Sequence, residues 1–254
     1  MSELVSCLMV TRNRLELAER AISCFAAQTW PDRELIIVDD GDDDYSAMVM
    51  PYVNNGLKVR YHRIQPEEGV RLGALRNRSI EYARGEWCMQ WDDDEWYHPD
   101  RIARQMSARS GRAGVALKWV LVDLPQSPFG PISFRADTGI ATPGTILFRR
   151  DADRYESLAR NEDGLFMREI RRQGLGVLGR DDSHLFVRCH HGSNTWELDH
   201  FLKRLRRRPI DIGHWARTRL TGDVSHHPLA KLSPRELATI ADLRAYSKRE
   251  TVST

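Results

Sequence analysis

Short apolar runs alternate with longer segments of helical spacing along the first part of the chain. Apolar runs of a few residues predict strands, whereas apolar residues at every third or fourth position predict helices. We therefore expect strands at residues 5–10, 34–38, 57–64 and 86–91, and helices at residues 15–28 and 70–83. Strands that alternate with helices are typical of βαβ units, so the pattern predicts an α/β fold with a mainly parallel sheet. Ligands of such sheets bind beyond the carboxyl ends of the strands.

The second half of the chain has a less regular pattern. It predicts strands at residues 114–123, 145–149 and 184–188, and a helix at residues 163–172. A loop rich in proline and glycine, residues 125–131, separates the first two of these strands. Ser233 and Glu236 have the spacing of a capping box, so a last helix should start there and run toward Lys248.

The composition is that of a folded, soluble protein. The chain has 254 residues, of which 41% are hydrophobic and 29% are charged, so intrinsic disorder is not expected. No apolar run approaches the roughly 18 residues of a membrane span. The N-terminus has no basic segment ahead of an apolar stretch, so no signal peptide is expected, and the cytoplasm is the expected location. The four cysteines are far apart, which argues against a zinc module or a disulfide framework.

Basic charge is concentrated toward the C-terminus. Residues 199–254 contain 12 Lys/Arg and 6 Asp/Glu, a net charge of +6, which leaves −4 for residues 1–198. Most of the excess lies in the run from Lys203 to Arg208. This run could contact phosphates, an anionic membrane surface or an acidic polysaccharide. A solvated helix face is the alternative interpretation.

Acidic clusters follow two of the expected strands. Asp92, Asp93, Asp94 and Glu95 come directly after the strand at residues 86–91. If that strand continued through them, Asp92 and Asp94 would point to one side and Asp93 to the other. Oxygen ligands of this kind suit Mg²⁺ or Mn²⁺, which bind substrate phosphates at the same time. A solvated acidic loop is the alternative.

The second acidic cluster, residues 39–44, ends the expected strand at residues 34–38. A carboxylate at a strand end could accept hydrogen bonds from a nucleoside. An aspartate-rich turn is the alternative, because aspartate tolerates the backbone angles of turns.

Several motifs occur in the order and spacing of one known family. They are Thr11-Arg12-Asn13-Arg14, Gln28-Thr29-Trp30, residues 34–41, Ala74-Leu75-Arg76-Asn77, Ala83-Arg84-Gly85-Glu86 and Asp92-Asp93-Asp94. With these motifs, residues 4–108 resemble glycosyltransferase family 2. Residues 144–150 and 162–163 resemble the acceptor-side strand and the catalytic Glu-Asp motif of that family. The resemblance implies an inverting nucleotide-sugar transferase with the GT-A fold.

The resemblance also implies roles for single residues. The nucleobase would be bordered by Thr11, Arg12 and Asp40, and Arg76 would approach the base or the diphosphate. The ribose side would be formed by Asp92 and Asp93. The metal, Mn²⁺ or Mg²⁺, would be bound by Asp94 and His191. The family often has tyrosine at the position of Arg12, so here the base would stack on a guanidinium plane or on no side chain at all, and the resemblance favours uracil over another base less strongly. For His191, a hydrogen-bonded structural role in a turn is the alternative.

Asp163 is the candidate general base. An inverting transferase must remove the proton of the attacking hydroxyl, and a carboxylate within hydrogen-bond reach can do this. Asp163 also stands at the start of an expected helix, where an aspartate interacts favourably with the helix dipole. That structural role is the alternative.

Together these expectations form one hypothesis about fold and organisation. Residues 1–198 would form a GT-A domain, a mixed and mostly parallel sheet flanked by helices, with a nucleotide-sugar-binding half (1–108) and an acceptor-binding half (109–198). Residues 199–254 would form a basic helical extension.

The expected function is that of a metal-dependent inverting glycosyltransferase of the hexosyltransferase type, with a nucleotide-sugar donor, a UDP-sugar by preference, and a hydroxyl acceptor. A polyanionic acceptor, either polysaccharide or nucleic acid, could bind residues 203–208, and the protein could lie at a membrane surface. The alternatives are a sugar nucleotidyltransferase, a glycoside hydrolase, and a non-catalytic protein that binds nucleotide or nucleic acid.

Overall fold

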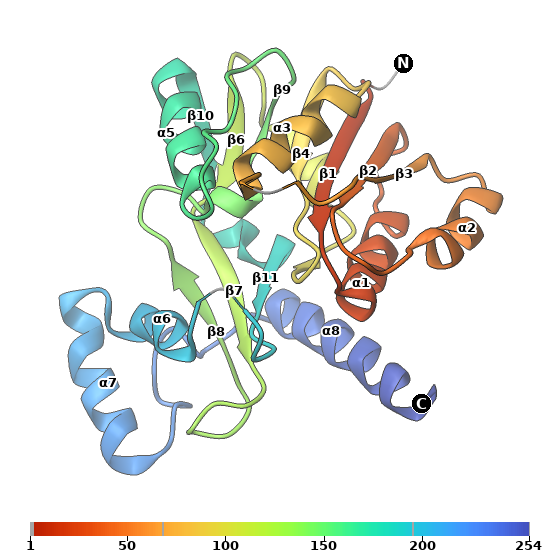
Figure 1. Cartoon of the computed structure of the whole chain (residues 1–254). Coiled ribbons are helices and arrows are strands. Elements are labelled where there is room, and N and C mark those ends of the chain that lie inside the picture. Colours follow the sequence, from red (N-terminus) through yellow and green to blue (C-terminus); the bar gives the residue numbers. More distant parts are fainter. Residues whose placement is uncertain (1–2, 68, 195, 254) are drawn as a thin grey trace. The chain divides into compact units, whose positions relative to one another are not determined.

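The structure is a computed structural model that describes residues 3–67, 69–194 and 196–253. The chain forms two compact units, each made of two chain segments (Figure 1). The first unit contains Met1–Leu117 and Ala141–Leu178, and the second contains Lys118–Ile140 and Gly179–Thr254. These limits do not coincide with the expected divisions after residues 108 and 198. The expected GT-A domain of residues 1–198, its two halves and the extension of residues 199–254 stay predictions.

The first unit is built on a seven-stranded sheet with the order β10-β6-β9-β4-β1-β2-β3. Its strands are β1 (Val5–Thr11), β2 (Arg33–Asp39), β3 (Val59–Arg63), β4 (Trp87–Gln90), β6 (Gly114–Leu117), β9 (Leu147–Arg149) and β10 (Leu175–Leu178). Neighbouring strands are parallel except where β9 pairs with β4 and β6. The expected mixed, mostly parallel sheet is therefore confirmed.

Helices flank this sheet. The first unit contains α1 (Leu15–Ala26), α2 (Ser46–Asn54), α3 (Leu72–Tyr82), α4 (Arg101–Ser107), α5 (Glu162–Gly174), the 3₁₀ helix η1 (Pro143–Thr145) and the short strand β5 (Trp96–Tyr97). Ile80 of α3 and Phe166 and Ile170 of α5 share one buried hydrophobic cluster with Leu8 of β1 and Phe148 of β9. Each such side chain contributes about 1.5–3 kcal/mol on burial. The cluster thus fixes α5, from late in the sequence, against strands from its beginning.

The second unit contains a smaller sheet. β7 (Trp119–Leu124) pairs antiparallel with β8 (Ile132–Asp137) and parallel with β11 (Phe186–Cys189). The remaining elements are the 3₁₀ helices η2 (Arg180–Leu185) and η3 (Lys203–Arg206) and the helices α6 (Leu198–Leu202), α7 (Pro209–Thr221) and α8 (Pro234–Ser253). The expected helical character of the C-terminal segment is confirmed.

The predicted capping box at the start of α8 is also confirmed. The backbone N–H of Ser233 donates to Glu236 Oε2 at 2.7 Å, and the backbone N–H of Glu236 donates to Ser233 Oγ at 3.4 Å. Glu236 in addition pairs with the buried Arg135 of β8. The capping residue therefore also joins α8 to the sheet of its own unit.

The expectation of one strand at residues 114–123 is wrong. β6 ends at Leu117, where the chain leaves the first unit, and β7 starts at Trp119 in the second unit. Most residues on both sides of this break are buried, so hydropathy does not mark it. The expected loop at residues 125–131 joins β7 to β8, and β8 has no counterpart among the expected strands. Within the described part of the chain, no helix combines the length and the hydropathy needed to cross a bilayer.

Candidate functional site

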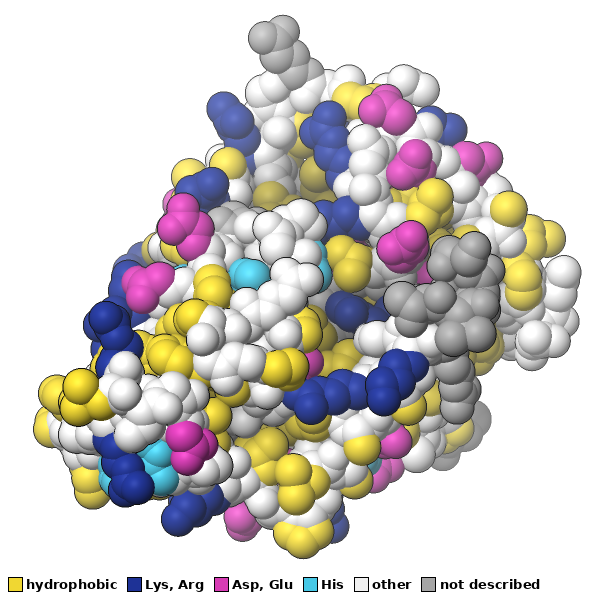
Figure 2. Space-filling view, turned by 90° about the horizontal axis from the view of Figure 1, so that it is seen from below, with side chains coloured by type: hydrophobic (Ala, Val, Ile, Leu, Met, Phe, Trp, Pro, Cys, Tyr) yellow, Lys and Arg dark blue, Asp and Glu magenta, His cyan; other side chains and the backbone are white. Residues whose placement is uncertain are grey.

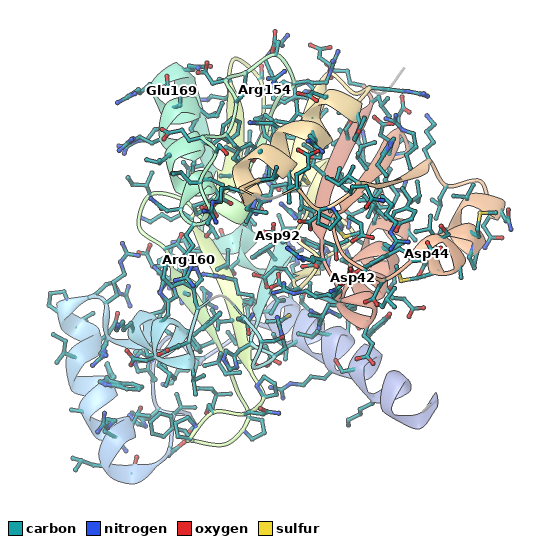
Figure 3. All side chains as sticks on the ribbon, in the orientation of Figure 1. Asp42, Asp44, Asp92, Arg154, Arg160 and Glu169 are labelled. Carbon is teal, nitrogen blue, oxygen red and sulfur yellow. The ribbon has the colours of Figure 1, made fainter. Side chains whose placement is uncertain are left out.

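Three consecutive carboxylates follow the carboxyl end of β4, in the middle of the larger sheet. β4 ends at Gln90, and Asp92 leads into a turn that contains Asp93 and Asp94, so none of the three continues the strand. β1 and β2 run parallel to each other, and β1 runs parallel to β4, so their carboxyl ends reach the same edge. Asp92 lies at this edge, with Asp42 and Asp44 further along it, after β2 (Figure 3). Both acidic clusters, each expected at the end of a strand, therefore lie at the same edge of the sheet.

The turn gives these carboxylates an orientation different from the expected one. Arg14 Nη1 lies 3.4 Å from Asp93 Oδ1 and 3.4 Å from Asp94 Oδ2. Asp92 instead faces Arg76. The expectation that Asp92 and Asp94 point to one side while Asp93 points away is therefore wrong, because strand alternation does not persist through a turn.

Asp93 is the most enclosed of the three. Its side chain is buried and accepts a 2.7 Å hydrogen bond from Thr11 Oγ1. Burial and the neighbouring Asp94 raise the pKa of Asp93 to about 7, although Thr11 and Arg14 act against this. Thr11 is itself buried and contacts Tyr45 Oη at 3.1 Å, so in this structure its hydroxyl positions a carboxylate.

Asp92 is held on several sides. Its Oδ1 accepts hydrogen bonds from Arg76 Nη2 at 3.0 Å and Gln90 Nε2 at 3.1 Å, and its backbone carbonyl accepts one from Tyr97 Oη at 2.7 Å. A Cβ atom added to Gly144 would lie 2.8 Å from Asp92 Oδ2. Glycine at position 144 thus leaves the room that this carboxylate occupies, and the contacts together fix its rotamer.

Arg76 connects Asp92 to the start of α5. Its Nε donates to Glu162 Oε1 at 3.0 Å, and both side chains are buried. Although burial opposes the charge, the carboxylates around it raise the pKa of Arg76, so it stays a cation. The structure thus joins the Asp92 motif to the Glu162-Asp163 motif, as the resemblance implied for two parts of one site.

Asp163 is half-buried in the first turn of α5. Burial raises the pKa of Asp163, the nearby Arg76 lowers it, and Glu162 and Asp92 raise it again, with a net upward direction. Its Oδ1 accepts a 2.7 Å hydrogen bond from the backbone N–H of Gly164. Asn161, the residue before the helix, makes no side-chain capping bond. A carboxyl group with a raised pKa beside other ionisable groups is a frequent feature of catalytic sites.

Two of the residues expected at the nucleobase, Arg12 and Asp40, directly follow β1 and β2. Arg12 Nη1 lies 3.6 Å from Asp40 Oδ2, and the Arg12 side chain is 61% exposed, so its guanidinium plane is open to a ligand. Burial raises the pKa of Asp40, although Arg12 opposes this shift. Asn13 has a left-handed backbone, with φ of 51°, and its Oδ1 accepts from the backbone N–H of Asp42 at 2.7 Å. That bond ties the loop after β1 to the loop after β2.

His191 belongs to the second unit, where it follows β11. Its backbone N–H donates to Asn194 Oδ1 at 2.8 Å, and its ring Nδ1 lies 2.9 Å from Ser193 Oγ. These contacts describe an ordered turn. The metal-binding role of His191 stays a prediction.

The carboxylate oxygens at the sheet edge suit a hard divalent cation whose remaining coordination positions are filled by the substrate. Among the described residues, no three His, Cys, Asp or Glu side chains gather into a ready metal site. Mg²⁺ and Mn²⁺ need fewer protein ligands when substrate phosphates and waters fill the other positions. The Asp94 side chain is 20% exposed and presents oxygen ligands at the sheet edge. One carboxylate with a diphosphate would therefore fit such an ion.

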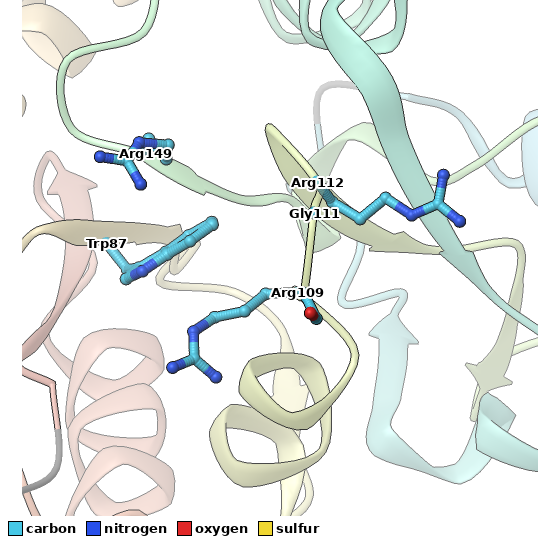
Figure 4. Close-up of a pocket in the computed structure, with 6 residues that line it drawn as sticks. Trp87, Arg109, Gly111, Arg112 and Arg149 are labelled. Atoms are coloured by element: carbon cyan, nitrogen blue, oxygen red, sulfur yellow. The ribbon is translucent and has the colours of Figure 1, made fainter.

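A concavity of about 510 Å³ lies elsewhere, at the amino end of β4 (Figure 4). It is lined by Trp87, Arg109, Ser110, Gly111, Arg112 and Arg149. Two of its arginines are already paired, Arg109 with Glu3 and Arg149 with Glu86. It occupies the opposite end of the strand from Asp92 and is not the candidate site.

Sequence reasoning assigned no role to several residues that shape this site. Arg14 belongs to the motif Thr11-Arg12-Asn13-Arg14, and Gly144 belongs to residues 144–150, so the resemblance to the family could have indicated both as site residues. Gln90, Tyr97 and Tyr45 gave no signal, because their contacts to Asp92 and Thr11 exist only after folding.

Comparisons with known proteins agree with this geometry. A family model described as glycosyl transferase family 2 matches residues 6–122. EpsH of Bacillus subtilis, which is named as a glycosyltransferase, is 35% identical over 110 residues, which are 42% of this chain and 30% of EpsH. The chain thus spans about a third of the length of that relative. The N-terminal part of this chain resembles glycosyltransferase family 2.

Solved structures extend the likeness to nearly the whole chain. TarS from S. aureus, in complex with UDP, has a TM-score of 0.58 at 18% identity and covers 92% of this chain and 68% of its own. The mannosyltransferase PcManGT from Pyrobaculum calidifontis, in complex with GDP-Man and Mn²⁺, has a TM-score of 0.58 at 16% identity. The match covers 95% of this chain and 75% of the PcManGT chain. At these identities the likeness shows the fold, and the expected GT-A fold is confirmed.

Proposed function

We propose that this protein is a metal-dependent inverting glycosyltransferase of the hexosyltransferase type, which moves a sugar from a nucleotide-sugar donor to a hydroxyl acceptor. The observation that carries the proposal is the pair of ion pairs made by Arg76, 3.0 Å to Asp92 and 3.0 Å to Glu162. Through Arg76, the carboxylates expected to hold the donor stand beside the carboxylate expected to remove the acceptor proton. The family match and the GT-A fold support the same activity.

The donor would lie along the carboxyl edge of β1, β2 and β4. Arg12 and Asp40 would border the nucleobase, with the exposed guanidinium of Arg12 stacked on the ring. Thr11 would act beside them through Asp93, to which it donates. Asp92 and Asp93 would face the ribose. We infer a UDP-sugar as the donor, although the structural neighbours were solved with either a uridine or a guanosine diphosphate compound.

Asp94 would hold Mn²⁺ or Mg²⁺, with His191 as a further ligand. Such an ion supplies positive charge to the departing nucleoside diphosphate. Arg14, between Asp93 and Asp94, and Arg76, beside Asp92, add fixed positive charge around the same carboxylates. The protein would bind the diphosphate end of the donor through this cluster.

Asp163 would act as the general base. As the acceptor oxygen forms its bond to the anomeric carbon, its proton passes to the Asp163 carboxylate, and the bond from that carbon to the diphosphate oxygen breaks on the opposite face. The electron pair of that bond leaves with the nucleoside diphosphate, so the sugar inverts its configuration. Burial raises the pKa of Asp163, which makes its carboxylate a better proton acceptor.

Ligand-dependent thermal stability tests the donor and metal parts of this proposal. A nucleoside diphosphate present at about 100 times its dissociation constant adds about 2.7 kcal/mol to the free energy of unfolding. We expect UDP or GDP to raise the melting temperature of the wild-type protein with Mn²⁺, and to do so much less with EDTA or in Asp94→Ala. Equal shifts in all of these conditions would contradict the metal requirement.

The alternatives predict other chemistry. A sugar nucleotidyltransferase would consume a nucleoside triphosphate and a sugar phosphate and release pyrophosphate. A glycoside hydrolase would cleave an oligosaccharide without any nucleotide. A non-catalytic binding protein would keep its affinity in Asp163→Asn and turn over nothing in either form.

A further inference from the structure

Helix α7 of the second unit packs against its own unit through polar and aromatic side chains. Its buried residues are Asp211, Trp215 and Thr218. Asp211 accepts two 2.8 Å hydrogen bonds from the guanidinium of Arg208, which precedes the helix. The Trp215 ring meets the ring of Phe129, in the loop between β7 and β8, edge-on with centroids 5.6 Å apart. These contacts fix which side of α7 faces inward.

The opposite side of α7 is apolar and exposed. Ile210 is 71% exposed, Ile212 57% and Leu220 88%. At about 3.6 residues per turn, Gly213, Ala216 and Leu220 lie along one line of the helix surface. Ile210 and Ile212 flank this line on its two sides. A surface helix normally turns its apolar stripe toward the core, so α7 presents outward what most helices bury.

Two arginines are the charged residues on the outward side of α7, a helix that the structure describes in full. Arg217 and Arg219 are exposed and lie on opposite sides of the apolar line. The acidic residue of α7, Asp211, is buried. Asp223, in the loop after α7, acts electrostatically on Arg217, and the outward side keeps a positive charge even when Asp223 is counted. In Figure 2, apolar and basic side chains adjoin at the surface at the left of the view, on the side where Figure 1 shows α7.

This combination of side chains is typical of a helix that lies on a bilayer. A group of exposed apolar side chains marks a surface that binds another molecule. On a bilayer, the apolar side chains enter the acyl region, while arginines at the border of the apolar side contact the lipid phosphates. With 13 residues, α7 is too short to cross a bilayer and long enough to lie along one.

We propose that the outward side of α7 binds the surface of an anionic lipid bilayer. Ile210, Ile212 and Leu220 insert into the acyl region, and Arg217 and Arg219 lie at the level of the lipid phosphates. The inference is independent of the proposed function, because it names a surface to which the protein attaches whatever reaction it catalyses.

The proposed contact differs from the basic run that the sequence offered for a membrane surface. In residues 203–208, Lys203 and Arg206 pair with the two oxygens of Asp199, at 3.1 and 3.4 Å. Leu205, the apolar residue of the run, is buried. Part of the charge of the run is therefore balanced locally, and the run has no exposed apolar side chain to insert.

A lipid surface fits the outward side of α7 better than a second copy of the chain does. A symmetric dimer through α7 would bring four arginines into one interface, two from each copy, without a carboxylate from the outward side of either helix. Like charges without counterions repel one another. Lipid phosphates supply the counterions, and each arginine near an anionic surface strengthens binding about fivefold.

Vesicle flotation of the full chain tests the contact. The probes are vesicles of phosphatidylcholine alone and vesicles of phosphatidylcholine and phosphatidylglycerol in equal parts. The variants are the double substitution Ile210→Gln with Leu220→Gln and the matched control Leu237→Gln, at a leucine of α8 that is 55% exposed. We expect the wild type and the control to bind the anionic vesicles alike. The double variant should bind them at least about tenfold more weakly, because burial of one side chain of this size changes an equilibrium by about that factor.

Removing the two charges should weaken the same binding. Arg217→Gln with Arg219→Gln should lower the affinity for anionic vesicles about fivefold for each charge, and added salt should weaken the wild type more than this variant. Arg235→Gln is the matched control, because Arg235 is exposed in α8. Melting temperatures of all variants check that they are folded.

A fluorescent label reports the contact itself. The four cysteines of the chain are buried, so a polarity-sensitive thiol label on Leu220→Cys reacts at the new cysteine. Its emission should shift to the blue when anionic vesicles are added, whereas the emission of the same label on Leu237→Cys should not shift.

The proposal is overturned if the wild type does not float with anionic vesicles, if neutral vesicles bind it equally well, or if Leu237→Gln loses as much binding as the double variant. It is also overturned if sedimentation velocity shows a dimer of the free protein that the double variant dissociates, because a second copy would then occupy this side of α7. Nucleoside diphosphate binding should be equal in all variants, since α7 carries none of the residues proposed for the donor site. A failure of membrane attachment is thereby distinguished from a failure of the proposed function.

Discussion

Arg76 and Glu162 lie 86 positions apart in the sequence, and their side chains form a buried ion pair of 3.0 Å between α3 and α5. The same guanidinium pairs with Asp92 after β4. Arg76, in α3, thus holds together carboxylates from two other parts of the chain, the loop after β4 and the start of α5. The relationship explains why the site depends on α5 being packed onto the sheet.

Replacing Arg76 should destabilise the fold. Arg76→Met leaves Glu162 buried without its partner, and breaking a buried pair typically costs about 3–5 kcal/mol. Arg78→Met is the matched control, because Arg78 is in the same helix and pairs with the exposed Glu67 at the surface, where such pairs contribute about 0–1 kcal/mol. Urea unfolding of both variants measures the difference. Equal losses of stability would show that the buried pair has no special role.

Gly144→Ala should weaken donor binding with little loss of stability. The new Cβ would lie 2.8 Å from Asp92 Oδ2, so the carboxylate would have to move away from its position beside Arg76 and Gln90. Gly179→Ala is the control, since no atom lies within 4 Å of its added Cβ. We expect nucleoside diphosphate affinity to fall several-fold in Gly144→Ala alone. Unchanged affinity in that variant would remove Asp92 from the donor site.

The pH dependence of the unfolding free energy should reveal how much the ionised Glu236 carboxylate stabilises the fold. Burial alone would raise its pKa, but hydrogen bonds from Arg135, Ser183 and Ser233 lower the pKa of Glu236 to about 2. A carboxyl whose folded pKa is depressed stabilises the protein above its unfolded pKa of about 4.3, and the contribution disappears as the pH falls toward the folded value.

Glu236→Gln should therefore be about 3–5 kcal/mol less stable than the wild type at neutral pH, where it breaks a buried pair. The two proteins should converge as the pH falls from about 5 toward 2. Unfolding free energies measured across that range check this, with Asp242→Asn, an exposed position in the same helix, as the control. A difference that stays constant with pH would contradict the ionic role.

The elements with a complete local pattern could be predicted from the sequence. The strands β1, β2 and β4 and the helices α1, α3 and α5 each carry their apolar spacing within one segment, and they form at the expected positions. Residues 114–123 could not be divided correctly, because the chain changes sheets at Lys118 inside one apolar run.

The candidate site divides in a similar way. Its carboxylates could be located, because strand ends in a parallel sheet gather at one edge. Their orientation could not, since it depends on a turn after Gln90 and on the position of Arg14, which bridges Asp93 and Asp94. The charge of the Lys203 to Arg208 run was visible in the sequence, but only folding shows which of its cations pair with carboxylates, as Arg206 does with Asp199.

Asp163→Asn should separate donor binding from chemistry. The amide cannot take up a proton, whereas its oxygen can still accept the hydrogen bond from the backbone N–H of Gly164. General-base assistance typically contributes about 10²–10⁴-fold in rate, so turnover should fall by that factor while donor affinity and melting temperature persist. If Asp163 serves only the helix, Asp163→Ala should lose about 0.5–2 kcal/mol of stability and keep near-normal turnover.

The most direct test is hydrolysis of a nucleotide-sugar by the protein with Mn²⁺, a reaction in which water takes the place of the acceptor. The measured quantity is the anomeric configuration of the released sugar. Proton NMR of the first-formed product resolves the two anomers before they interconvert. We predict that the protein releases the inverted anomer, at a rate that falls sharply with EDTA and in Asp163→Asn. The proposed mechanism would be contradicted by a retained configuration. It would also be contradicted if Asp163→Asn, or the wild-type protein with EDTA, hydrolysed the donor as fast as the wild-type protein with Mn²⁺.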